Sequence, residues 1–290
     1  MLTIMNLNCA NYDDHNRAFK PTDPNPEPGL WADRLPLIVQ AIVDACPDVI
    51  GLCEIRYDPN NPFNRLCAAF WQAQDVEVQN CGAMDMGQQI MTLLLARAPE
   101  YEGATMITDK GDDYGGGVWE GQSIISRFPV VAHGVIDHGK GGTDGNNRIT
   151  QWAQLSTPAE GTLWVYNAHL STDVNVAAQN AGQVLADMQA RVGSFAEASA
   201  CVVGDMNSEP SMAAMQAFAA AGLVDVWALL ETGDGFTFQA WKPVKRIDYC
   251  WATPALSAAA HSITLIGTEL QPPAGGSYLS DHIGVVTVFD

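Results

Sequence analysis

The apolar run Cys201-Val202-Val203 leads directly into Gly204-Asp205-Met206-Asn207-Ser208-Glu209-Pro210. Such a run predicts a strand, and alternate residues of a strand share a face, so Asp205 and Asn207 are expected on one side of its end. An acid there can act as a general base toward water while the amide holds the water or the electrophile. The alternative is a helix N-cap region before residue 211, because Asp, Asn and Ser all cap helices well.

The 290-residue length and 47% apolar composition are sufficient for one large core, so a single domain over residues 1–290 is expected. Seven cysteines form no C-x-x-C pair, which indicates buried free thiols in a reducing compartment. The N-terminus has no basic region followed by an apolar region and a cleavage site, and no apolar stretch reaches bilayer length. We therefore expect a soluble, cytoplasmic monomer without a transmembrane segment.

The formal net charge of −19 comes from 14 Lys plus Arg residues against 33 Asp plus Glu residues. A surface of this kind repels polyanions over most of its area. Extended duplex DNA is therefore a disfavoured partner, although a local site for one phosphate is not excluded.

Hydrophobic spacing predicts strands interleaved with helices in the first part of the chain and dense strands in the middle. Helices are expected at residues 31–46, 84–97, 175–198 and 211–220. Strands are expected at residues 2–8, 48–55, 122–127, 130–136, 149–155, 162–169, 261–268 and 284–289, with a strand pair within 224–251. Residues 108–121 and 141–147 are rich in Gly and Asp and are expected to be loops. Two packed sheets with helices outside follow from this order.

Polar residues close, or nearly close, many of these apolar runs. In enzymes built on sheets, strand ends converge into one crevice, so residues scattered along the chain can form one site. Carboxylates and amides are the preferred ligands of a hard cation such as Mg²⁺ or Mn²⁺. The set comprises Asn8, Glu54, His169, Asp205, Asn207, Asp248, Asp281 and His282.

Seven motifs carry these residues, in one order and over essentially the whole length. They are Leu7-Asn8, Leu52-Cys53-Glu54-Ile55, residues 120–129 (E-G-Q-S-I-I-S-R-F-P), Asn167-Ala168-His169-Leu170, Gly204-Asp205-Met206-Asn207, Lys245-Arg246-Ile247-Asp248-Tyr249 and Ser280-Asp281-His282. This ordered set resembles the endonuclease/exonuclease/phosphatase superfamily, and it is far more specific than any single motif. The resemblance implies a deoxyribonuclease-like α/β fold, a four-layer sandwich of two mixed β-sheets flanked by α-helices.

The resemblance also implies a divalent-metal-dependent phosphoric ester hydrolase. Glu54, with Asn8 and Asp281 nearby, would hold Mg²⁺ or Mn²⁺ against a phosphate oxygen. Asp205 would orient and deprotonate the attacking water, and Asn207 would support the water or the phosphate.

Two histidines complete the implied site. His282, paired with Asp248, would bind or protonate a phosphate oxygen, and His169 would be the second histidine that contacts phosphate. The chain departs from the family pattern at Cys53, where Gln is common, and at Ala10, where the apurinic-endonuclease branch has an acid. The second departure disfavours a role in base-excision repair.

Three further residues are candidates for substrate contacts. Arg148 follows the Gly-rich stretch 141–147 and could bind a phosphate with two hydrogen bonds, although a solvent-facing arginine has the same pattern. Tyr114 and His138 lie in or near expected loops, where core packing or loop anchoring is the alternative.

The resulting hypothesis is a phosphodiesterase that hydrolyses a small-molecule or lipid-head-group phosphodiester by direct attack of activated water. A DNA or RNA endonuclease or exonuclease is the second hypothesis. A non-catalytic binding protein on the same fold is the third, and the intact set of acids and imidazoles disfavours it.

Overall fold

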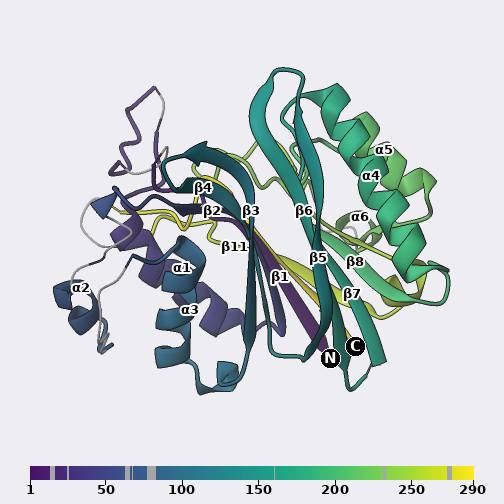
Figure 1. Ribbon diagram of the computed structural model, residues 1–290, viewed down its shortest axis with the longest axis horizontal. Coiled ribbons are helices and arrows are strands. Elements are labelled where there is room, and N and C mark those ends of the chain that lie inside the picture. The colour runs from purple at the N-terminus through teal and green to yellow at the C-terminus, as the bar shows by residue number, and fades with distance from the viewer. Residues whose placement is uncertain are drawn as a thin grey trace.

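Two β-sheets lie face to face in the computed structural model, which describes residues 1–13, 17–24, 26–62, 66, 68–76, 83–159, 161–230, 233–272 and 276–290 (Figure 1). The strand order of the first sheet is β11 (Ala260–Ile266), β12 (Gly284–Phe289), β1 (Leu2–Asn8), β2 (Val49–Tyr57), β4 (Val118–Ser126) and β3 (Thr105–Gly115). The order of the second sheet is β5 (Val130–Gly141), β6 (Asp144–Thr157), β7 (Gly161–His169), β8 (Ser199–Asp205), β10 (Asp248–Ala252) and β9 (Val224–Asp225).

Helices cover the outer faces of both sheets. The four long helices agree with the expected ones: α1 (Trp31–Ala45), α3 (Met86–Arg97), α4 (Val174–Val192) and α5 (Ala213–Ala220). Short helices that the sequence did not predict are α2 (Ala68–Ala73), α6 (Val226–Leu230), α7 (Pro254–Ser257) and the 3₁₀ helix η2 (Pro99–Tyr101). In Figure 1, α1 and α3 lie outside the first sheet, and α4 and α5 lie outside the second. The predicted four-layer sandwich is therefore confirmed.

Three apolar layers hold these elements together. Between the sheets, side chains such as Ile4 and Val49 pack in the same buried cluster as Val165 and Val203. Separate clusters lie beneath α1 and α3 and beneath α4 and α5. The central strands are covered on both faces, which is why their sequences are continuous apolar runs rather than alternating ones.

The expectation of a loop over residues 108–121 is wrong, because these residues form most of the β3–β4 hairpin. Two register shifts, at Lys110/Asp112 and at Asp113/Gly115, interrupt the alternation of side chains that would have marked the strands. Gly121 is required by close packing of the two backbones, since a Cβ there would lie 1.9 Å from the Asp109 carbonyl oxygen.

The expected flexible loop over residues 141–147 is also largely strand. Strand β5 continues to Gly141 and β6 begins at Asp144, so only a tight turn separates them. The Asp173 carboxylate, which caps α4, accepts hydrogen bonds from the Thr143 amide at 2.9 Å and the Thr143 hydroxyl at 3.1 Å. The turn is therefore held against the start of α4.

Cysteines in the described part of the chain are free thiols, and all except Cys46 are buried. Cys67 and Cys81 lie outside the described residues. No described helix has the length and apolarity that crossing a bilayer requires.

Candidate active site

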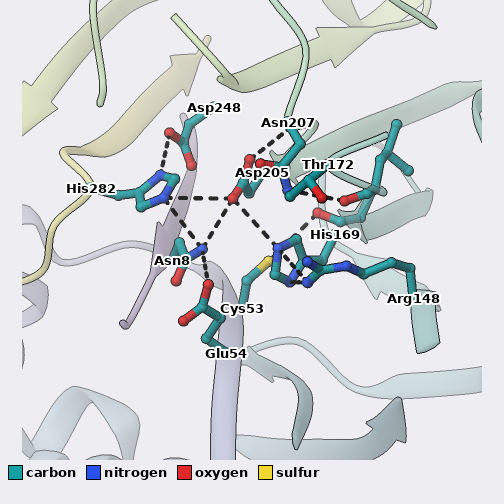
Figure 2. A network of polar contacts seen from close by, with 12 residues as sticks. Asn8, Cys53, Glu54, Arg148, His169, Thr172, Asp205, Asn207, Asp248 and His282 are labelled. Atoms are coloured by element: carbon teal, nitrogen blue, oxygen red, sulfur yellow. Dashed lines mark hydrogen bonds and ion pairs between the residues drawn. The ribbon is translucent and has the colours of Figure 1, made fainter. Parts of the chain in front are cut away.

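The strand ends that carry the polar residues meet at one end of the sandwich. Strands β1 and β2 are parallel, as are β7 and β8, so their C-terminal ends point the same way. Strands β10 and β12 run antiparallel to β8 and β1, so their first residues lie at this same end. Within the second sheet, Asp205 is the register partner of both His169 and Asp248. Figure 2 shows the side chains pointing toward one another.

Asp205 is the centre of this group. Its Oδ2 atom accepts a hydrogen bond from the Asn8 amide nitrogen at 3.0 Å, and it lies 3.5 Å from His169 Nε2 and 3.6 Å from His282 Nε2. Its Oδ1 atom accepts from the Asn207 backbone N–H at 2.8 Å. Burial and the neighbouring Asp248 carboxylate raise the pKa of Asp205 to about 7, against the opposing effect of His282. Asp205 can therefore bind and release a proton near neutral pH.

The backbone on either side of Asp205 has unusual conformations that fix this position. Gly204 has φ of 121°, and a Cβ there would lie 2.2 Å from the Ala168 carbonyl oxygen of the neighbouring strand. Asn207 has φ of 46°, and its side-chain amide donates to the Leu170 carbonyl at 3.0 Å. The helix-cap alternative is wrong, because α5 begins only at Ala213 after an N-cap without a side-chain hydrogen bond.

Glu54 enters the site from a β-bulge. Strand β2 shifts register against β4 between Leu52 and Ile55, and Glu54 has φ of 57°, which is rare for a residue with a side chain. Its carboxylate accepts from the Asn8 side chain at 2.9 Å and from the Asn11 backbone N–H at 3.1 Å. The bulge thus turns an acid out of an otherwise buried strand toward the site.

The oxygen donors around Glu54 suit a hard divalent cation. Glu54 and Asp281 line the same cavity, of about 410 Å³, and no cysteine lines its described walls. Asn8 directs its amide nitrogen toward Glu54 and Asp205, while its oxygen accepts from the Ala10 N–H at 3.0 Å. In this arrangement Asn8 bridges the two carboxylates as a donor, and its role as a metal ligand stays a prediction.

A second group of potential ligand atoms, from Asp205, Asp248 and His282, lies within 4.8 Å of one another. In this group the His282 Nδ1 atom is already 2.9 Å from Asp248 Oδ2. Burial alone would lower the pKa of His282, but the Asp248 and Asp205 carboxylates outweigh it and raise this pKa well above its usual value. The geometry therefore describes an imidazolium paired with a carboxylate.

His169 has the opposite electrostatic environment. Burial and the Arg148 guanidinium, whose Nη1 atom lies 2.9 Å from His169 Nε2, lower the pKa of His169 to about 3. Arg148 is in turn fixed by Asp144, which accepts from its Nε atom at 2.8 Å and from the Thr172 N–H at 3.0 Å. His169 is therefore a neutral imidazole, and Figure 2 shows it beside the Arg148 side chain.

Residues 5–282 match the endonuclease/exonuclease/phosphatase family. The chain belongs to this family. No curated protein matches its sequence significantly.

Solved structures of the family share the fold at low sequence identity. An endonuclease/exonuclease/phosphatase family protein of Leptotrichia buccalis superposes with a TM-score of 0.69 at 16% identity, over 100% of both chains. A mannosyl-6-phosphatase of Bacteroides thetaiotaomicron gives 0.67 at 18% identity, also over 100% of both chains. D. rerio TDP2, in complex with a single-strand DNA product, gives 0.63 at 19% identity over 100% of this chain and 98% of that one. The chain thus has the phosphoesterase fold of this family.

The three predicted substrate residues have different outcomes. Arg148 is buried and lines the cavity. Tyr114 lies in strand β3 rather than a loop, outside the cavity lining, where the Arg56 guanidinium stacks 4.5 Å from its ring centroid. His138 does not reach the site, because it lies in β5 and contacts Gln183 of α4 at 2.6 Å and Thr150 at 2.9 Å. Both residues lie in hairpin strands where loops were expected, and their role in substrate binding stays a prediction.

Sequence reasoning missed a polar group behind Glu54. The Asn11 side chain donates to Glu120 at 2.8 Å, and Arg56 lies 3.3 Å from the same carboxylate. Glu120 opens a motif that marks the family, and Arg56 is two residues from Glu54 on one strand, so both signals were present. Asp144 could not have been found, since its partner Arg148 was itself assigned to solvent or substrate.

Proposed function

We propose that this chain is a Mg²⁺- or Mn²⁺-dependent phosphodiesterase that hydrolyses a small-molecule or lipid-head-group phosphodiester. The observation that carries the proposal is the buried carboxylate of Asp205, placed between the imidazoles of His169 and His282 and linked to Glu54 through the Asn8 amide, which donates to both. Site residues of this kind, with opposing pKa shifts in one cavity, are typical of acid–base catalysis.

The proposed reaction is a single in-line displacement. Asp205 orients a water molecule and takes its proton as the water oxygen forms a bond to phosphorus. The bond from phosphorus to the leaving alcohol oxygen breaks with its electron pair, and that oxygen gains a proton from solvent or an acid of the site. No covalent enzyme intermediate forms.

Other side chains stabilise the charge that develops on phosphate. His282, held as an imidazolium by Asp248, donates to a non-bridging oxygen, and Asn207 supports the water or the phosphate. Arg148 supplies a second cation on the opposite side, beside the neutral His169. Glu54 and Asp281 would hold the divalent cation, which would supply Lewis-acid stabilisation of the phosphate.

Charge supports the proposed substrate class. The net charge of −19 disfavours long nucleic acids, so the nuclease remains the second candidate, supported by the DNA product bound to D. rerio TDP2. The mannosyl-6-phosphatase has the same fold, so monoesters belong in any test. A binding protein without activity is disfavoured by the complete set of acids and imidazoles.

Hydrolysis of a panel of phosphoesters tests the proposal directly. We expect release of p-nitrophenol from bis-p-nitrophenyl phosphate with Mg²⁺ or Mn²⁺, and its loss on addition of EDTA. Plasmid DNA, oligonucleotides, phospholipids and sugar phosphates complete the panel. The absence of metal-dependent turnover on every member would refute the proposal, and activity restricted to DNA would favour the nuclease.

A further inference from the structure

The cavity in front of Asp205 has two chemically different walls. Arg148, His169 and Thr172 line the polar wall. The lining also includes Met212, Phe238, Lys245 and Ile247, a group that we call the Lys245 wall. Displacement at phosphorus needs no apolar surface, so the Lys245 wall is available to the organic part of a substrate.

Backbone hydrogen bonds fix the Lys245 wall relative to the catalytic centre. Phe238 and Lys245 exchange N–H to carbonyl bonds at 3.1 Å in both directions, and the Thr237 N–H donates to the Lys245 carbonyl at 2.7 Å. Phe238 also bridges to His282, with their ring centroids 4.8 Å apart. A group bound on this wall therefore has a defined position relative to His282.

Charge pairing distinguishes Lys245 from the other cations of the cavity. Arg148 forms a salt bridge with Asp144 at 2.8 Å, and His282 contacts Asp248 at 2.9 Å. Lys245 is exposed, and it forms no salt bridge within the described part of the chain. The protein nevertheless carries a net charge of −19. Four carboxylates line the same cavity and disfavour anions, so a second anionic group of a ligand is best placed beside Lys245, which forms no salt bridge with the described residues.

We infer that the Lys245 wall is a subsite that selects a compact organic group carrying a second anionic group, such as a carboxylate or another phosphate. This inference rests on the proposed phosphoesterase function and specifies its substrate class. The apolar side chains of Phe238, Ile247 and Met212 contact the carbon skeleton, and Lys245 pairs with the anionic group. A neutral or cationic head group lacks that pairing.

Three p-nitrophenyl phosphodiesters test the subsite, with 1-propanol, 3-hydroxypropanoate or choline as the second alcohol. We expect the lowest KM for the 3-hydroxypropanoate diester. Lys245→Met, which keeps the aliphatic stem, should raise KM of the anionic diester about five-fold relative to that of the neutral one. Comparing variant with wild type on each diester removes differences in intrinsic reactivity.

Lys242→Met is the matched control, because Lys242 is an exposed lysine of the same loop outside the cavity lining. It should leave the order of the three KM values unchanged. Three outcomes would overturn the inferred subsite. Lys245→Met could change KM equally for all three diesters, the wild-type protein could have its lowest KM for the choline diester, or the effect of Lys245→Met could be confined to a single-stranded oligonucleotide. Failure of the wild-type protein to hydrolyse any phosphoester would instead remove the proposed function on which the subsite rests.

Discussion

His282 and His169 lie 3.6 Å and 3.5 Å from the same carboxylate oxygen of Asp205, and both are buried. His282 contacts Asp248 through Nδ1, and the pKa of His282 is raised well above its usual value. His169 contacts Arg148, and the pKa of His169 is lowered to about 3. Similar burial thus gives different charges, a cation at His282 and a neutral ring at His169, because the sign of the nearest partner decides which protonation state is stable.

The difference gives the two imidazoles different capabilities. An imidazolium donates two hydrogen bonds and stabilises negative charge, whereas a neutral imidazole has one donor and one acceptor nitrogen. On the proposed mechanism His282 therefore stabilises charge on phosphate. His169 orients groups on the side where Arg148 already supplies the positive charge.

The largest effect is expected from Asp205→Ala and His282→Ala. Each removes a group that acts on the reacting atoms, so kcat/KM with bis-p-nitrophenyl phosphate should fall by at least ~10³-fold. Thermal unfolding and circular dichroism should show a folded protein, which separates lost chemistry from lost structure. Near-normal turnover by either folded variant contradicts its assigned role.

A smaller effect, about 10²-fold in kcat/KM, is expected from Asp248→Asn. The Asp248 carboxylate helps to raise the pKa of His282, so its removal lowers that pKa. The alkaline limb of the pH profile, where His282 loses its proton, should therefore move to lower pH. The acid limb reflects protonation of Asp205, whose pKa is about 7, and should also move to lower pH, because the Asp248 carboxylate helps to raise that pKa as well. An unchanged alkaline limb would show that His282 is not the group that titrates there.

The smallest effect, about ten-fold in KM, is expected from Arg148→Met, which removes one charge-assisted contact to phosphate. Loss of the cation should also raise the pKa of His169 above 3, while burial keeps it below the usual value. The ring ¹H–¹³C resonances of His169 report this shift in a pH titration. Arg191→Met is the control, since Arg191 pairs with Asp187 on α4, away from the cavity lining. An unaltered His169 titration in Arg148→Met would show that Arg148 does not set its charge.

The sequence predicted most of the fold because the central strands and long helices are buried, and burial leaves an apolar pattern in their sequences. Apolar runs such as residues 48–55 and helical spacing in residues 31–46 reflect burial against neighbouring layers, and both elements are present. The prediction of loops at residues 108–121 and 141–147 was wrong. Register shifts, glycines and acids interrupt the apolar alternation there, so the sequence pattern does not indicate the two hairpins. Their strands are stabilised by pairing with partners and not by their own composition.

The site shows the same division. The sequence alone determined which polar residues lie at the strand ends, from Asn8 to His282, and in which order. That order also indicated the family. Only the tertiary structure decided that Asp144 holds Arg148 in the cavity lining and that a β-bulge turns Glu54 toward the site. It also decided that the pKa values of His169 and His282 shift in opposite directions. The reason is physical: protonation depends on burial and on partners a few ångströms away, and those partners come from distant parts of the chain.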